Sequence, residues 1–265
     1  MAGPIDAGWP QLFLLDGFRL LRAGVPVLVP RGLQRVIALV ALRPGATRTH
    51  LAGLLWPETP EDRALPSLRT ALWRLRRQAH CPIVTVGDTI ALDPDVYVDV
   101  DDLVRTAARI RDGGDPRGAD RILTTGRHDL LPGWYDDWVL LERERLRQLR
   151  LHTLEEMARV QLRLGRHGEA LQSALEAVRA EPLRETPHRL IVETHLAEGN
   201  AYEALHAFYV YRDLLLRDLQ LEPSEAMCAL LGDLLTPLGR PAPRPTAPRP
   251  TTAARAPRQP ISRAP

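Results

Sequence analysis

The chain has 265 residues, of which 45% are hydrophobic and 26% charged, as is typical of a globular protein with room for two modest domains. It contains no lysine, which excludes a phosphate-binding P-loop and Schiff-base chemistry. No apolar run approaches the roughly 20 residues that span a bilayer, and the N-terminus lacks the pattern of a secretory signal. The two cysteines, Cys81 and Cys228, are far apart and have no metal-binding spacing. We therefore expect a cytoplasmic protein without a membrane partner.

Charge is unevenly distributed along the chain, although the formal net charge is only +2. Residues 17–92 contain eleven arginines against four acidic residues, whereas residues 103–240 contain 19 arginines against 22 acidic residues. Residues 241–265 contain five arginines and no acidic residue. The basic first segment indicates an anionic partner for that part of the protein.

The beginning of the chain predicts a small sheet followed by a helix. Short apolar runs at 12–15, 18–21 and 26–29 are separated by glycine-containing turns, which predicts three antiparallel strands. The apolar residues of 31–42 recur at helical spacing, and a Pro-Gly pair follows them. We expect these elements to form the first part of one small domain.

Two further helices are predicted before residue 80. Thr47 is positioned to cap a short helix that stops at Trp56. The next helix, over 60–78, has a start signal in which Thr59 supplies a hydroxyl cap and is followed by a proline and an early acid. The apolar stripe of this third helix consists of Leu65, Leu68, Leu72 and Leu75.

The opposite side of the third helix is polar and basic. Such a face is typical of a helix that packs on a core and presents its side chains to phosphates and base edges, and a solvated basic face is the alternative. Arg74 and Arg77 are the arginines that we expect to contribute most. The full set expected to contact DNA on this helix is Arg63, Ser67, Thr70, Trp73, Arg74 and Arg77.

Three residues of this helix, Arg69, Trp73 and Arg76, lie at the margins of its polar face. The indole of Trp73 has three possible positions: on the DNA backbone, under the following hairpin, or in the core. Arg69 and Arg76 are closer to the core edge, where Glu58 or Glu61 are candidate partners. Their positions on the helix therefore leave them outside the expected DNA-binding set.

Pro66 lies inside the third helix, where proline removes a backbone hydrogen bond and clashes with the carbonyl of Asp62. Two outcomes are compatible with it. Either the helix kinks at this position, or residues 60–64 form a separate first turn and the reading helix begins near Leu65.

A β-hairpin is predicted after the third helix. The β-prone runs 82–86 and 89–92 are joined by Gly87-Asp88, which is a good signal for a two-residue turn. The order of strands, three helices and a hairpin is that of an OmpR-type winged helix, whose third helix enters the major groove while the hairpin, or wing, approaches the minor groove. The hairpin carries no arginine, so any contact would rest on Thr85, Thr89 and backbone amides.

From Val100 onward the pattern is almost entirely helical. Leu162, Gly165 and the triplet 169–171 recur 34 residues later, which is the period of tetratricopeptide repeats, and unrelated helical hairpins are the alternative. A turn at 131–135 leads into a long amphipathic helix. Trp134, Tyr135 and Trp138 are expected to anchor the first helix pair, and any part that stays exposed is a candidate partner contact.

Catalytic and metal-binding patterns are missing from the sequence. The aspartates between residues 93 and 102 lack the glycine and glutamate of an EF-hand loop, so a polar linker is expected. The histidines include no HExxH pair, and no GxSxG or Cys–His pattern indicates a nucleophile. We expect a protein that is not an enzyme and that needs no cofactor or metal.

Taken together, these motifs resemble those of the Streptomyces antibiotic regulatory protein (SARP) family of transcriptional activators. The resemblance covers nearly all of residues 10–236. Its carriers are LQRVIALVAL (33–42), LAGLLWPETPEDRA (51–64), SLRTALWRLRR (67–77), ALDPDVYVDVDDL (91–103), DLLPGWYDDWVLLERERLRQL (129–149) and the EAL segments near 169 and 203.

The resemblance implies a mainly α fold with a small β part, in which a winged helix-turn-helix domain precedes an all-α domain of tetratricopeptide-like repeats. It also implies binding to direct repeats near promoters, self-association and contact with RNA polymerase holoenzyme. We expect a flexible N-terminus (1–10), an OmpR-type winged helix (11–101), a bacterial transcriptional activation domain (102–238) and a disordered Pro/Arg/Ala-rich tail (239–265).

The sequence therefore predicts a sequence-specific DNA-binding activator of a specialised-metabolite gene cluster. The alternative is a tetratricopeptide-like adaptor or antagonist whose winged helix no longer binds DNA specifically. The alternative is motivated by Pro66 and by the uncharged wing.

Overall fold

A computed structural model describes residues 9–77, 82–116, 119 and 129–235. The tail expected to be disordered, most of the N-terminal segment 1–10, and Cys81 lie outside the described residues. Cys228 has a free thiol. The chain is mainly helical, with two small sheets near its beginning, as predicted.

The first sheet contains one strand more than the sequence indicates. Strands β1 (Pro10–Phe13), β2 (Arg19–Arg22) and β3 (Val25–Pro26) are antiparallel, as predicted, although β3 is shorter than the apolar run at 26–29. The additional strand, β6 (Tyr97–Val98), pairs in parallel with β1 and completes the order β3-β2-β1-β6. It has only two residues and its partner lies 86 residues away, since Gln11 pairs with Tyr97, so no local pattern reveals it.

Two helices follow the sheet with the predicted bounds. Helix α1 (Arg31–Leu42) buries nearly all of its residues after the first turn. Helix α2 (Arg48–Leu55) begins where Thr47 Oγ1 accepts a hydrogen bond from the backbone N–H of His50, as expected for a cap, and it ends at Trp56.

Helix α3 (Glu61–Arg76) packs its apolar stripe on α1 and α2. Ala64, Leu68, Leu72 and Leu75 are buried, and Leu65 is half-buried against the same core. The prediction of Thr59 as the cap is wrong, because Pro60 occupies that position and no side chain caps the helix. The helix is continuous through Pro66, so the separate first turn is also ruled out.

The predicted hairpin consists of β4 (Ile83–Val86) and β5 (Thr89–Leu92), with Val86 opposite Thr89 across the two-residue turn. Gly87 has φ +59°, a conformation that favours glycine. The hairpin is attached to the segment before α2, because the N–H of Ile90 donates to the carbonyl of Ala46 at 3.1 Å. Its position relative to α2 is therefore fixed by backbone hydrogen bonds.

The remainder of the described chain is a series of helices. Neighbouring helices from α6 to α9 pack against each other in chain order, as in a tetratricopeptide array, and α10 packs against α8. The 34-residue repeat has a structural basis: Gly165 and Gly199 have φ +70° and +77° in equivalent turns, and Ala170 and Ala204 are fully buried. The elements are α4 (Asp99–Arg111), α6 (Asp137–Arg163), α7 (His167–Ala180), α8 (Glu185–Ala197), α9 (Ala201–Leu219), α10 (Glu225–Leu231) and a 3₁₀ turn (Gly232–Leu235).

One hydrophobic core runs from the winged helix into α6. Trp134 and Trp138 are buried in it, edge to face, and the Arg31 guanidinium of α1 lies 5.5 Å from the Trp134 ring centroid. These two tryptophans therefore help to join α6 to the winged helix. Tyr135 is 80% exposed, so its expected role as an anchor is wrong: the chain turns its ring away from the surface on which both tryptophans pack.

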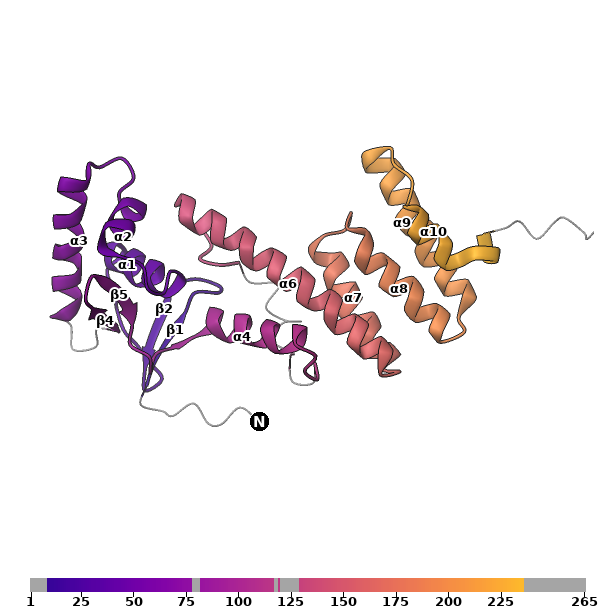
Figure 1. Cartoon of the computed structure of the whole chain (residues 1–265), viewed down its shortest axis with the longest axis horizontal. Coiled ribbons are helices and arrows are strands. Elements are labelled where there is room, and N and C mark those ends of the chain that lie inside the picture. The colour runs from indigo at the N-terminus through magenta and orange to yellow at the C-terminus, as the bar shows by residue number, and fades with distance from the viewer. Residues whose placement is uncertain (1–8, 78–81, 117–118, 120–128, 236–265) are drawn as a thin grey trace, which may run out of the picture.

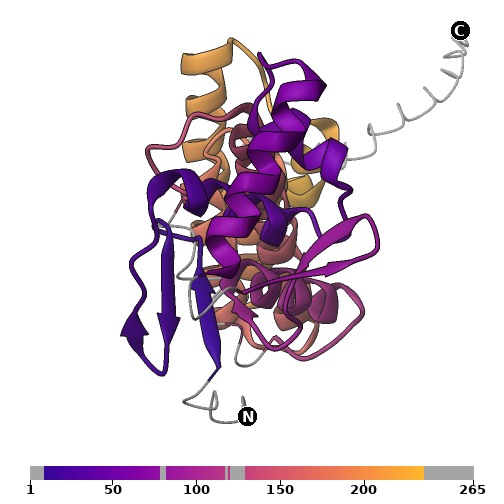
Figure 2. The same ribbon diagram turned by 90° about the vertical axis from the view of Figure 1, so that its left-hand side faces the viewer.

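The arrangement places α3 at one end of the molecule and α9 and α10 at the other (Figure 1). Viewed onto the α3 end, the strands β1–β3 lie on one side of this helix and the β4–β5 hairpin on the other (Figure 2). In the described part of the chain, no helix has the length and apolar character needed to cross a membrane.

Candidate nucleic-acid interface

The polar face of α3 is directed outward, as predicted. Its arginines, Ser67 and Thr70 are all exposed. The Ser67 hydroxyl donates to the carbonyl of Arg63 at 2.9 Å, and the Thr70 hydroxyl donates to the carbonyl of Pro66 at 2.9 Å. Each hydroxyl oxygen keeps its acceptor capacity and faces solvent, where it can accept a hydrogen bond from a base amino group.

One flank of α3 borders a groove of about 440 Å³ that the sequence did not predict. Arg74, Ser67 and Thr70 form its edge on the α3 side. Apart from Ala71 of α3, its other residues come from the start of α1 and the end of α2, which are distant in sequence, so no spacing rule could bring them together. The complete lining is Pro30, Gly32, Leu33, Trp56, Ser67, Thr70, Ala71 and Arg74.

The other flank of α3 faces the hairpin. The Arg76 Nη2 group donates to Thr85 Oγ1 at 2.9 Å, which links the end of α3 to β4. The expected pairing of Arg76 with Glu58 or Glu61 is therefore wrong, since the hairpin provides its partner. Thr89, the second expected wing residue, donates its hydroxyl to the carbonyl of Val86 at 2.8 Å and thereby closes the hairpin turn.

Trp73 lies between these two flanks and is 55% exposed, which excludes the core position. The guanidinium carbon of Arg77 lies 4.9 Å from the centroid of the Trp73 ring. A cation over an indole face is attracted by the ring quadrupole. The pair forms an exposed platform near the C-terminal end of α3, and it leaves the edges of the Arg77 guanidinium open to an anion.

The arginines of α3 differ electrostatically from those of the helical domain. Every arginine from Arg143 to Arg217 has a carboxylate partner or donates to backbone carbonyls. Within the described residues, Arg63, Arg69 and Arg74 have no such ion pair. Positive charge on α3 is therefore available to an external anion, whereas the arginines from α6 onward are already engaged within the protein.

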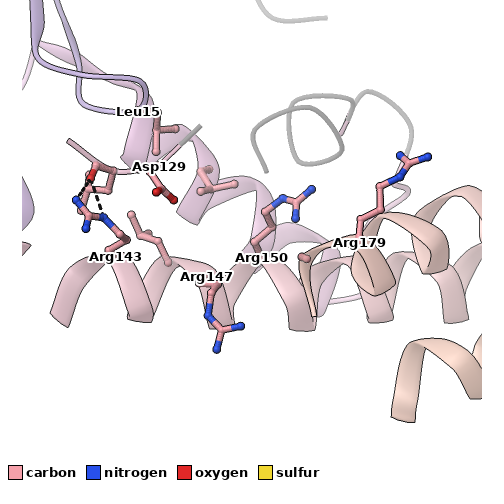
Figure 3. Close-up of a pocket in the computed structure, with 10 residues that line it drawn as sticks. Leu15, Asp129, Arg143, Arg147, Arg150 and Arg179 are labelled. Carbon is pink, nitrogen blue, oxygen red and sulfur yellow. Dashed lines mark hydrogen bonds between the residues drawn. The ribbon is translucent and has the colours of Figure 1, made fainter. Parts of the chain in front are cut away.

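A second cavity, of about 290 Å³, lies where the winged helix meets α6 and α7 (Figure 3). Four arginines line it, but each has a partner within the protein. Arg143 donates to three backbone carbonyls of the loop before α6, while Arg147, Arg150 and Arg179 pair with glutamates of α6 or α7. Arg147 points to the side of α6 opposite Arg150 and Arg179 (Figure 3). These arginines hold the junction together, and we do not assign them to the interface.

The acidic segment that follows the hairpin has a structural role. The carboxylate of Asp93 accepts a hydrogen bond from the N–H of Asp95 at 3.1 Å, in a local turn. Asp99 is buried and accepts from the N–H groups of Leu14 and Leu15. Among the described residues, no group of three or more His, Cys, Asp or Glu side chains is arranged to hold a metal ion.

Comparison with known proteins identifies the helical part. Residues 98–235, more than half of the chain, match the model of the bacterial transcriptional activator domain. The regulatory protein AfsR of Streptomyces coelicolor is 29% identical over 235 residues, which are 82% of this chain and 23% of that protein. AfsR of Streptomyces griseus is 29% identical over 252 residues, 86% of this chain and 24% of that protein. The chain thus spans about a quarter of the length of these relatives.

The fold also has a counterpart among solved structures. Mycobacterium tuberculosis EmbR, in a complex with a low-affinity phosphopeptide, aligns with a TM-score of 0.62 and 18% identity over 85% of this chain and 65% of that one. At this identity the likeness concerns the fold alone. Together, the family match and the two regulators confirm the resemblance that the sequence motifs indicate.

Proposed function

The chain belongs to the bacterial transcriptional activator domain family, and from this premise we propose that it is a cytoplasmic transcription activator that binds specific promoter DNA through α3. The regulatory role agrees with its likeness to two regulatory proteins. We further propose that its targets are direct repeats near the promoters of a specialised-metabolite gene cluster. The proposed DNA-contacting residues are Arg63, Ser67, Thr70, Trp73, Arg74 and Arg77 of α3 and Thr85 and Thr89 of the wing.

The observation that carries this proposal is the charge of the exposed α3 face. Arg63, Arg69 and Arg74 have no carboxylate partner within the described residues, and Arg77 lies on the exposed ring of Trp73. Unpaired arginines on a helix at the end of the molecule suit a phosphate-lined groove, because they form charge-assisted hydrogen bonds there without first breaking internal ion pairs.

The position of the helical domain supports a second part of the proposal, which is that this domain contacts other proteins. Its last helices lie at the end of the molecule opposite α3, so α3 can occupy DNA while they remain accessible (Figure 1). We propose that this domain contacts RNA polymerase holoenzyme and a second copy of the chain on adjacent repeats. The exposed ring of Tyr135, close to the junction of the two domains, adds an aromatic side chain suited to such a contact.

The test is a binding titration of the full chain with the intergenic DNA beside its gene and with a random duplex of the same length. We expect footprints over direct repeats spaced by about one helical turn, roughly 10 base pairs. We also expect affinity to fall steeply as salt rises, in proportion to the phosphates neutralised. Near-equal affinity for both duplexes at physiological salt would contradict the proposal.

The second candidate function, an adaptor or antagonist without specific DNA binding, rests on the charge of the wing. The described hairpin residues, β4 and β5 with their turn, include no arginine, and both expected wing threonines are engaged within the protein. The same titration separates the two candidates, because an adaptor would show weak binding and a shallow salt dependence while it retained its protein partners.

A further inference from the structure

The wing lacks a cation of its own, but one reaches it from the neighbouring helix. We propose that Arg76, which the sequence placed outside the interface, binds a DNA phosphate beside the wing and is held in position for that contact by Thr85. The inference rests on the proposed DNA-binding function and adds a residue to its contact surface. The pair Arg76–Thr85 is therefore a part of the interface that spans helix and wing.

The geometry of Arg76 leaves most of its donors available. Within the part of the chain that the structure describes, only its Nη2 group is used, in the 2.9 Å hydrogen bond to Thr85 Oγ1. A guanidinium has five N–H donors in a planar fork, so Nε and Nη1 can still donate to a phosphate. The side chain is exposed, and within the described residues no carboxylate pairs with it.

Thr85 is a rigid support for this arginine. It lies on β4 opposite Ile90 of β5, and the N–H of Ile90 donates to the carbonyl of Ala46 in front of α2. Thr85 is half-buried, and its hairpin is thereby tied to the helical part of the same domain. An arginine held in its bound position loses less rotamer freedom on binding, which favours affinity.

The flank of α3 on which Arg76 lies favours a phosphate over a base edge. Arg76 shares the last turn of the helix with Arg74, but its guanidinium is held on the hairpin flank by Thr85, at the end of the helix that approaches the DNA backbone in recognition helices. Arg74, on the other flank, borders the groove together with Ser67 and Thr70. The two flanks therefore contribute differently to DNA binding. Arg76 increases the affinity for any duplex, whereas the residues on the groove flank recognise the base sequence.

The test compares Arg76→Ala, Thr85→Val and the double variant with the wild-type full chain. Affinities for a specific and a random duplex are measured at several salt concentrations. We expect Arg76→Ala to weaken both duplexes by the same factor and to lower the slope of log K against log salt by about 1, the value for one lost phosphate contact. Thr85→Val should weaken binding less and keep the slope, and it should add less to the loss in the Arg76→Ala background than it costs alone.

The control is Arg217→Ala, which removes one exposed charge from α9, where the arginine pairs with the adjacent Asp218. It should leave affinity and slope unchanged. An unchanged slope in Arg76→Ala, a selective loss on the specific duplex, or a lowered melting temperature that accounts for the loss would overturn the assignment of Arg76. If the wild-type chain itself shows no salt-dependent DNA binding, the proposed function fails, and this inference fails with it.

Discussion

The buried carboxylate of Asp99 accepts two hydrogen bonds from the backbone N–H of Leu14, at 3.0 and 3.1 Å, across 85 residues of sequence. The same carboxylate also accepts from Leu15 at 3.0 Å. Asp99 begins α4, and Leu14 follows β1, so this side chain joins the first helix of the activator domain to the sheet of the winged helix. A negatively charged residue in the first turn also interacts favourably with the helix dipole.

Replacing Asp99 with asparagine should destabilise the whole molecule. The asparagine amide has one acceptor oxygen and would place an NH₂ donor against backbone donors in a site that is only 6% exposed. We expect a loss of about 1–3 kcal/mol in the free energy of unfolding, measured by urea denaturation. The exposed Asp95→Asn is the matched control and should change the free energy of unfolding little. Equal effects of the two variants would contradict a structural role for Asp99.

The hydrophobic core that the winged helix shares with α6 limits where the chain can be divided into fragments that fold. Arg35 donates both to the carbonyl of Leu55 and to the carboxylate of Asp136, and Trp138 packs into the core that contains α1. A fragment of residues 9–101 lacks the side chains that cover this part of α1. We expect it to melt without a cooperative transition, whereas residues 9–165, which retain α6, should melt cooperatively. A cooperative transition of the shorter fragment in a circular dichroism melt would contradict this.

Local patterns in the sequence predicted most of the elements. The bounds of α1 and the cap of α2 at Thr47 follow from periodicity and short-range hydrogen bonding, and the hairpin follows from its Gly87-Asp88 turn. The missed features depend on long-range contacts. The strand β6 exists because β1 pairs with it, and Tyr135 is exposed because only the two neighbouring tryptophans reach α1 and its surroundings.

The features of the candidate site also divide into those that local spacing predicts and those that depend on long-range contacts. Helical spacing alone shows which residues of α3 point away from the core, so the outward face was predicted correctly. Spacing does not show which side chains on that face already have partners. The bond from Arg76 to Thr85, the stacking of Arg77 on Trp73, and the groove bordered by Trp56 all require the position of other elements.

Replacing Pro66 with alanine should stabilise α3. Proline provides no N–H for the carbonyl of Asp62, and its ring crowds that carbonyl, although the helix continues through it. Alanine restores the hydrogen bond, and the greater freedom it gives the unfolded chain offsets part of the gain. We expect a net increase of about 1–3 kcal/mol in the free energy of unfolding. The control is Pro57→Ala in the loop before α3, where no helical bond is restored. A destabilised Pro66→Ala variant would show that the proline ring has packing contacts that outweigh the missing bond.

The stability of the helical domain should decrease in mild acid because of His188. Its ring stacks on Tyr211, with centroids 4.2 Å apart, and its Nε2–H donates to the carbonyl of Pro182 at 2.9 Å. Burial lowers the pKa of His188, an effect that the hydrogen bond to Pro182 and the nearby charge of Glu185 only partly oppose. The unfolded chain therefore binds a proton more readily than the folded one. The contribution of neutral His188 to the free energy of unfolding is therefore fully present above the ordinary histidine pKa of about 6.5, and it decreases as the pH falls below that value.

Unfolding titrations between pH 5 and pH 8 test this expectation. The variant His188→Gln keeps a side-chain donor but cannot be protonated, so its free energy of unfolding should vary less over this range than that of the wild type. The exposed His206→Gln is the matched control and should follow the wild-type curve. Parallel curves for the wild type and His188→Gln would contradict the assignment.

The sharpest test of base reading is at Arg74. This arginine borders the groove with Ser67 and Thr70 and has no ion pair within the described residues. If it forms a bidentate contact with guanine, Arg74→Ala should reduce the discrimination between specific and random duplexes by about 1–3 kcal/mol. The measurement is a pair of anisotropy titrations at one salt concentration, with Arg163→Ala on α6 as the control of equal charge. An equal loss on both duplexes would make Arg74 a phosphate contact, and sequence reading would then have to come from Ser67, Thr70 and the other arginines of α3.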